Sequence, residues 1–239
     1  ILLAGAALSS CNDISYAPAE PKGLMTITAT ISDEKAHSRT CVDTDGKDTD
    51  DYLAVKWHQG DEIGVYGDGT TKNACFTSKS AGKTSQFMGD MSGDNPKYAY
   101  YPYNTDNNVK AVNALVGNLT EEQPRDKEGR LTGDYKYGEP VEGKTNEFSF
   151  KHMFSMLRIT VDAAGTNLAN EQLESVKLTF TDSQGKERLV NGKFSFSAID
   201  GSYSNVTGGT NKVVMPWTEK PKLEAALTGF VTVMPTVKQ

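Results

Sequence analysis

Apolar residues and threonines alternate without interruption along residues 25–31, which read Met-Thr-Ile-Thr-Ala-Thr-Ile. Successive side chains of a β-strand point to opposite faces, so a period of two places every second residue on one face. The pattern therefore predicts a half-buried strand. Met25, Ile27, Ala29 and Ile31 are expected on its buried face, and the threonines on its wet face.

Many further short apolar runs follow, and turn residues separate them at short intervals. Strands are expected at residues 54–57, 62–66, 74–78, 85–88, 97–101, 109–115, 147–150, 156–162, 175–181, 193–197, 212–216 and 229–234. Glycine- and aspartate-rich turns such as those at 59–61, 67–69 and 200–202 lie between them. This spacing predicts an all-β fold of the sandwich or barrel type.

The chain is expected to divide into two β-sandwich domains in tandem. Residues 120–145 are polar and charged, which predicts a long surface loop. The composition changes near residues 153–156, so we place the N-terminal domain at 24–155 and the C-terminal domain at 156–239. The second part has few strands for a sandwich, and we expect that domain to be incomplete.

The first residues indicate export. Residues 1–11 are apolar or small and end in Leu-Ser-Ser-Cys, which resembles a bacterial lipobox at the end of a signal peptide. Cys11 is thus the expected lipidation site, and the polar residues 12–23 are an expected tether. The alternative is a short buried strand with an incidental cysteine. A lipidated Cys11 would hold the protein on the bacterial outer membrane.

The composition argues against several other functions. The net charge is −6 without a basic patch, which disfavours nucleic-acid binding. His37, His58 and His152 stand far apart, outside any zinc-ligand spacing. Residues 80–84 resemble a phosphate loop but lack its first glycine and a following helix. We therefore expect neither an enzyme nor a cofactor.

Two other groups of residues keep alternative interpretations. An acidic cluster at 43–51 has some of the oxygen ligands of a calcium loop but the wrong glycine position. A solvated loop is favoured there, with weak calcium binding as the alternative. Cys41 and Cys75 are expected to be free thiols, although an oxidising compartment would allow them to pair.

The aromatic run at residues 98–103, Tyr-Ala-Tyr-Tyr-Pro-Tyr, has two interpretations. Alternation along a strand places Tyr98 and Tyr100 on one face and Tyr101 on the other, which favours core packing. The alternative is that Tyr98, Tyr100, Tyr101 and Tyr103 bind a glycan by stacking against its rings.

Taken in order, several segments resemble the fimbrillin family, whose members are subunits of bacterial type V pili. Trp57 with Gly-Asp-Glu-Ile-Gly-Val-Tyr at 60–66 resembles the family's first hairpin, and the Tyr-rich run at 98–103 resembles its "A-Y-Y-P-Y" segment. Residues 150–161 are similar to the family's "H-x-x-S-x-L" strand junction. Residues 230–235, Phe-Val-Thr-Val-Met-Pro, resemble a late strand of the family.

The resemblance implies two transthyretin-like β-sandwich domains, export as a lipoprotein and cleavage after the first strand by an arginine- or lysine-specific protease. Arg39 is the candidate scissile residue and Lys35 the second candidate; the alternative is that Arg39 is an uncut surface residue. Cleavage would open a groove that a strand of a neighbouring pilin subunit fills. The implied partners are other pilin subunits and the processing protease, with a host protein or glycan as a further candidate. The alternative function is a surface glycan-binding lipoprotein.

Overall fold

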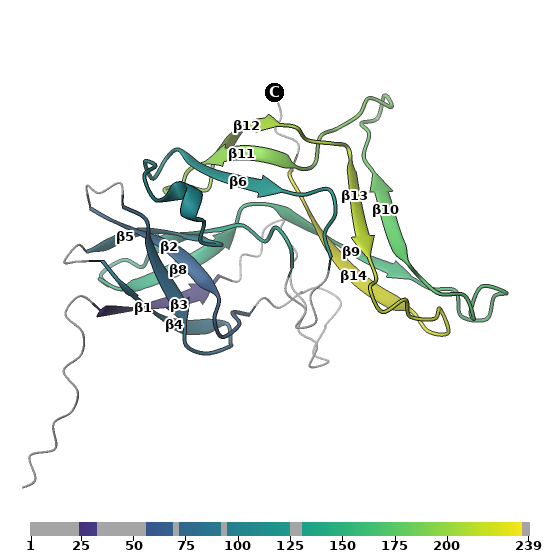
Figure 1. Cartoon of the computed structure of the whole chain (residues 1–239), viewed down its shortest axis with the longest axis horizontal. Coiled ribbons are helices and arrows are strands. Elements are labelled where there is room, and N and C mark those ends of the chain that lie inside the picture. Colours follow the sequence, from purple (N-terminus) through teal and green to yellow (C-terminus); the bar gives the residue numbers. More distant parts are fainter. Residues whose placement is uncertain (1–23, 33–55, 69–71, 92–94, 125–130, 236–239) are drawn as a thin grey trace, which may run out of the picture.

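The computed structural model describes residues 24–32, 56–68, 72–91, 95–124 and 131–235. These residues form fourteen strands and one short 3-10 helix, which confirms the predicted all-β class (Figure 1). The strands are β1 (Leu24–Ile31), β2 (Glu62–Gly67), β3 (Ala74–Ser78), β4 (Thr84–Asp90), β5 (Pro96–Tyr101), β6 (Leu115–Leu119), β7 (Lys136–Pro140), β8 (Glu147–His152), β9 (Ser155–Val161), β10 (Ser175–Thr179), β11 (Gly192–Phe196), β12 (Tyr203–Thr207), β13 (Lys212–Pro216) and β14 (Leu227–Val233), with η1 at Thr105–Asn107.

Seven of these strands close into a barrel in the order β1-β4-β3-β2-β5-β7-β8. Neighbouring strands pair antiparallel except at the closure, where β1 runs parallel to β8. Apolar side chains from β1, β2, β3, β4 and β8 fill the interior, together with Trp57. A closed barrel leaves no free sheet edge, so each strand depends on both of its neighbours.

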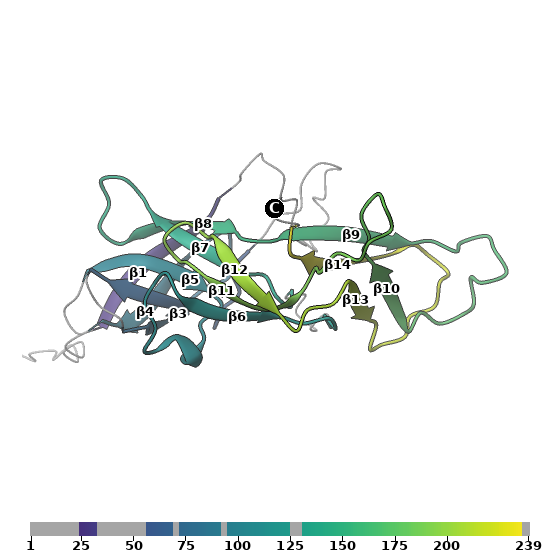
Figure 2. The same ribbon diagram turned by 90° about the horizontal axis from the view of Figure 1, so that it is seen from above.

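The remaining strands form three small sheets, β12-β11-β6, β14-β9 and β10-β13. Figures 1 and 2 both show the barrel at one end of an elongated molecule and β9, β10, β13 and β14 at the other. An aromatic core joins the barrel to the β12-β11-β6 sheet, because Tyr66 of β2 and Tyr100 of β5 belong to the same cluster as Phe194 and Phe196 of β11. The division into two domains at residues 155 and 156 stays a prediction.

The pairing of β6 does not follow sequence order. This strand comes from the first half of the chain, yet it pairs antiparallel with β11, from Gly192 opposite Leu119 to Phe196 opposite Leu115. The strand predicted at 109–115 was wrong, because turns occupy that segment up to residue 114 and β6 begins only at Leu115. Asn107 accounts for this start, since its side chain hydrogen bonds to both the backbone N–H and the carbonyl of Val116.

The prediction of a surface loop at 120–145 was wrong in part, because this segment contains β7, one of the seven strands of the barrel. Gly138 and Pro140 made this strand hard to detect, since both residues weaken strand propensity. Gly138 packs closely on its neighbours, because a Cβ there would lie about 3.0 Å from the Phe150 ring. The sequence also gave no prediction of β12, whose residues Tyr-Ser-Asn-Val-Thr are mostly polar.

Candidate functional site

The best candidate for a functional site is the position of β1 between β4 and β8, which we call the β1 seat. On one side β1 pairs with β4, from Leu24 opposite Asp90 to Thr30 opposite Thr84. On the other it pairs with β8, from Thr28 opposite Glu147 to Ile31 opposite Phe150. Because β1 closes the barrel, its removal would expose two strand edges at once.

The inward face of β1 matches the predicted alternation. Ile27 and Ala29 have no exposed surface, Ile31 is buried, and Met25 packs against the same core while partly exposed. Burial of a large aliphatic side chain contributes about 1.5–3 kcal/mol. The seat is therefore a strongly apolar surface once the strand is gone.

Trp57 lies on the inner side of the β1 seat, in the core of the barrel, and this position is called the floor of the seat. Its indole Nε1 donates a hydrogen bond of 3.0 Å to the carbonyl oxygen of Ala29. The indole meets Phe87 of β4 and Phe150 of β8 edge to face, with ring centroids 5.0 and 5.1 Å apart. Since Phe87 and Phe150 come from the strands on either side of β1, the Trp57 ring lies beneath β1 inside the barrel.

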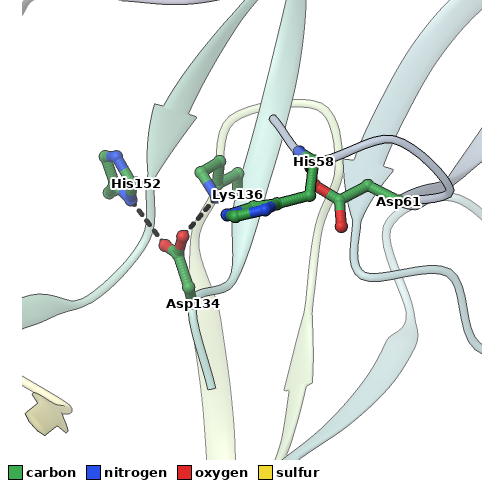
Figure 3. A network of polar contacts seen from close by, with 5 residues as sticks. All are labelled: His58, Asp61, Asp134, Lys136 and His152. Carbon is green, nitrogen blue, oxygen red and sulfur yellow. Dashed lines mark hydrogen bonds and ion pairs between the residues drawn. The ribbon is translucent and has the colours of Figure 1, made fainter. Parts of the chain in front are cut away.

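A buried polar network of Asp134, Lys136 and His152, drawn in Figure 3, contacts Trp57 through Lys136. Lys136 and His152 approach the carboxylate of Asp134 from two sides; Nδ1 of His152 lies 2.7 Å from Oδ1, and Lys136 forms an ion pair with Oδ2. The Lys136 ammonium also lies 5.2 Å from the ring centroid of Trp57 and 4.4 Å from that of Tyr101. These cation–π contacts and the ion pair compensate a lysine that is only 2% exposed.

The electrostatics of this network keep Asp134 ionised. Burial alone would raise the pKa of Asp134, but the charge of Lys136 and the contact with His152 outweigh it and hold that pKa well below its usual range. Nε2 of His152 is buried without a hydrogen-bond partner among the described residues. Beside the network, the backbone N–H of His58 donates to Asp61 at 2.8 Å. These contacts are suited to holding the side chains beneath Trp57 in fixed positions.

Sequence reasoning missed Asp134 and Lys136, because it assigned both to a surface loop. The signal that was available is the alternation of Tyr135 and Tyr137 with Lys136 and Gly138, which has the period of a strand. His152 lies at the end of β8, with a side chain 8% exposed.

The tyrosine run spans both sides of the barrel wall. Tyr100 is fully buried, and its hydroxyl accepts a hydrogen bond of 2.9 Å from Asn73. Tyr98 packs beside it in the aromatic core, whereas Tyr101 packs against the barrel interior. The hydroxyl of Tyr103 donates to Asn108 at 3.1 Å. The four rings therefore do not share one face, and glycan binding by them stays a prediction.

The remaining predicted site residues can be placed only in part. Cys11, Lys35, Arg39 and the acidic cluster at 43–51 lie outside the described residues, as does Cys41. Cys75 carries a free thiol, and burial raises its pKa to about 11.

Within the described ranges, no three His, Cys, Asp or Glu side chains are grouped to hold a metal ion. Those ranges also contain no helix long and apolar enough to cross a membrane.

Two comparisons with known proteins identify the family of this chain, and the family match begins at residue 39, after the end of β1. The model of the family described as "Fimbrillin-like" matches residues 39–235. A Bacteroides uniformis protein named "Putative fimbrium subunit Fim1C" is 30% identical over 192 residues, which cover 70% of this chain and 57% of the relative. The chain thus spans little more than half the length of that relative. The family match covers most of the chain, and the protein belongs to the fimbrillin-like family.

Proposed function

We propose that this protein is a structural or adhesive subunit of a bacterial surface pilus, and that it assembles with other pilin subunits by strand exchange at the β1 seat. It is exported as a lipoprotein through Cys11 and held on the outer membrane. A protease then cuts after Arg39, so that β1 leaves together with the lipid anchor. The protein acts by assembly, and it is not an enzyme.

The observation that carries this proposal is the place of β1 in the barrel. It is the first described strand in the chain, and it is the one that closes the barrel by a parallel pairing. Arg39 follows it by eight residues, since β1 ends at residue 31 and 39 − 31 = 8. One cut in this stretch would separate a whole barrel strand from the rest of the protein.

The energetics of the seat favour replacement over a permanently open groove. Loss of β1 would expose Phe87, Phe148 and Phe150 along with the free edges of β4 and β8. Exposed edges and apolar patches of this kind promote strand addition by another chain. An incoming strand would restore the ladder and the core together, which is how strand addition joins proteins.

A cleavage experiment tests this function. The purified lipidated protein is treated with an arginine-specific protease, and the new N-terminus and the assembly state are measured. We expect cleavage after Arg39, followed by polymers of the trimmed chain. Arg39→Ala should stay uncut and monomeric, whereas Lys35→Ala should behave as the parent does. A trimmed chain that remains monomeric at high concentration would contradict assembly by strand exchange.

A further inference from the structure

We infer that Trp57 selects which strand can occupy the β1 seat, by requiring a small side chain at the position that Ala29 fills. The selected partner is an extended strand of a second pilin subunit. This inference rests on the strand-exchange function proposed above, and it adds a sequence requirement for the incoming strand.

The Trp57 indole limits the space beneath Ala29. Ile27 and Ile31 are large inward residues, but the residue between them is alanine, and all three are buried. The Trp57 indole lies under this part of β1, because it contacts Phe87 of β4 and Phe150 of β8 and donates to the carbonyl of Ala29. A longer inward side chain at position 29 would have to displace this ring.

Trp57 cannot easily move away from its place beneath β1. Its backbone N–H and carbonyl hydrogen bond to Gly82 at 2.8 and 3.0 Å. Its ring also contacts Tyr101 edge to face at 5.4 Å between centroids, with the Lys136 ammonium 5.2 Å from the ring centre. Lys136 is in turn fixed by Asp134. Close-packed interiors transmit strain rather than absorb it, so a larger side chain has no easy place to go.

The neighbours of Ala29 along the sheet are also fixed in place. Ala29 lies opposite Ser85 of β4 and Phe148 of β8. The Ser85 hydroxyl is buried and held by Ser78 and the carbonyl of Ser80, each at 2.8 Å. Both flanking positions are therefore occupied and fixed. The seat accepts a strand with large, small and large inward residues at positions 27, 29 and 31.

A peptide-exchange experiment tests the inference on the whole protein. The chain is first nicked after Arg39, so that β1 is no longer covalently linked to the rest of the barrel and can be replaced by an added strand. Fluorescent peptides of residues 24–32 are then added, and the label that co-elutes with the protein in gel filtration is measured. The peptides carry the parent sequence, Ala29→Leu, or Thr26→Leu as a matched control at an exposed position of β1.

We expect the parent and Thr26→Leu peptides to bind alike and Ala29→Leu to bind at least about tenfold more weakly, as one lost inward fit of about 1.4 kcal/mol would give. A Trp57→Leu protein, with a smaller side chain on the floor of the seat, should accept the Ala29→Leu peptide better than the parent protein does. If that variant does not fold, the peptide series on the parent protein still tests whether the seat requires a small side chain at position 29.

The outcomes separate the two proposals. Equal binding of all three peptides would overturn the selection by Trp57 and leave strand exchange intact. Failure of the parent peptide to bind would contradict strand exchange itself. If the Thr26→Leu peptide also bound weakly, then any substitution in the strand would lower its affinity for the seat. That result would also overturn the specific role of Trp57.

Discussion

Nδ1 of His152 lies 2.7 Å from Oδ1 of Asp134. This contact joins the last residue of β8 to a residue that lies two positions before the start of β7. The other oxygen of the same carboxylate pairs with Lys136. One buried carboxylate thereby organises the polar groups under Trp57, and the stability of the barrel should depend on it.

Replacing Asp134 with Ala should destabilise the protein by about 3–5 kcal/mol, because it leaves the buried Lys136 without its compensating charge. Urea unfolding measured by tryptophan fluorescence gives the value. The matched control is Asp68→Ala, which removes the carboxylate of an exposed pair with Lys97. That change should cost far less, because water and salt screen an exposed ion pair. Equal losses in the two variants would show that the buried network adds no special stability.

The same carboxylate predicts a loss of stability in acid. Folding lowers the pKa of Asp134, so its ionised form favours the folded state. This contribution is fully present above the unfolded pKa of about 4 and is lost as the pH falls below that value.

Urea unfolding at a series of pH values should therefore show stability falling below about pH 4, and Asp134→Asn should show a shallower fall. Because other carboxylates also titrate there, the difference between the two proteins is the relevant measurement. Identical slopes would exclude Asp134 as a source of the acid sensitivity.

Gly64→Ala should be strongly destabilising. An added Cβ would overlap the ring of Tyr100 and crowd Oδ1 of Asn73, both of which are buried. Overpacking of this kind typically costs about 1–3 kcal/mol or more. Gly143→Ala is the control, since its left-handed backbone is strained by a side chain but has nothing within 4 Å of the new Cβ. Thermal unfolding should show the larger loss for Gly64→Ala, and the reverse order would contradict this view of β2.

Gln123→Ala should weaken the attachment of β14. The Gln123 side chain donates to the carbonyl of Thr232 at 2.8 Å and accepts from its N–H at 2.7 Å, so it replaces a strand neighbour. Each buried backbone group left unpaired costs about 1–3 kcal/mol. Amide hydrogen exchange at Thr232 should become faster in the variant. Glu122→Ala removes an exposed neighbouring side chain, and unchanged exchange in that control would assign the effect to Gln123.

The local sequence predicted individual strands well where one face is buried and the other is wet. The alternation at 25–31 predicted both β1 and its inward residues, because side-chain direction in a strand follows from position alone. The sequence did not predict β7, because its inward positions hold Lys136 and Gly138, which do not form a pattern of alternating hydrophobic residues. Asp134, two residues away, compensates the charge of the buried Lys136 together with Trp57 and Tyr101, and these two aromatic partners lie on other segments of the chain.

By itself, the sequence determined the all-β class, the buried face of β1 and the motif around Trp57 that resembles the family. The tertiary structure alone decided that β1 closes a barrel by pairing with β8, that β6 pairs with β11, and that Trp57 lies beneath Ala29. The physical reason is that alternation fixes which face of a strand is buried, but not which strand lies beside it. Pairing depends on register and packing between residues far apart in the chain, and no local pattern records them.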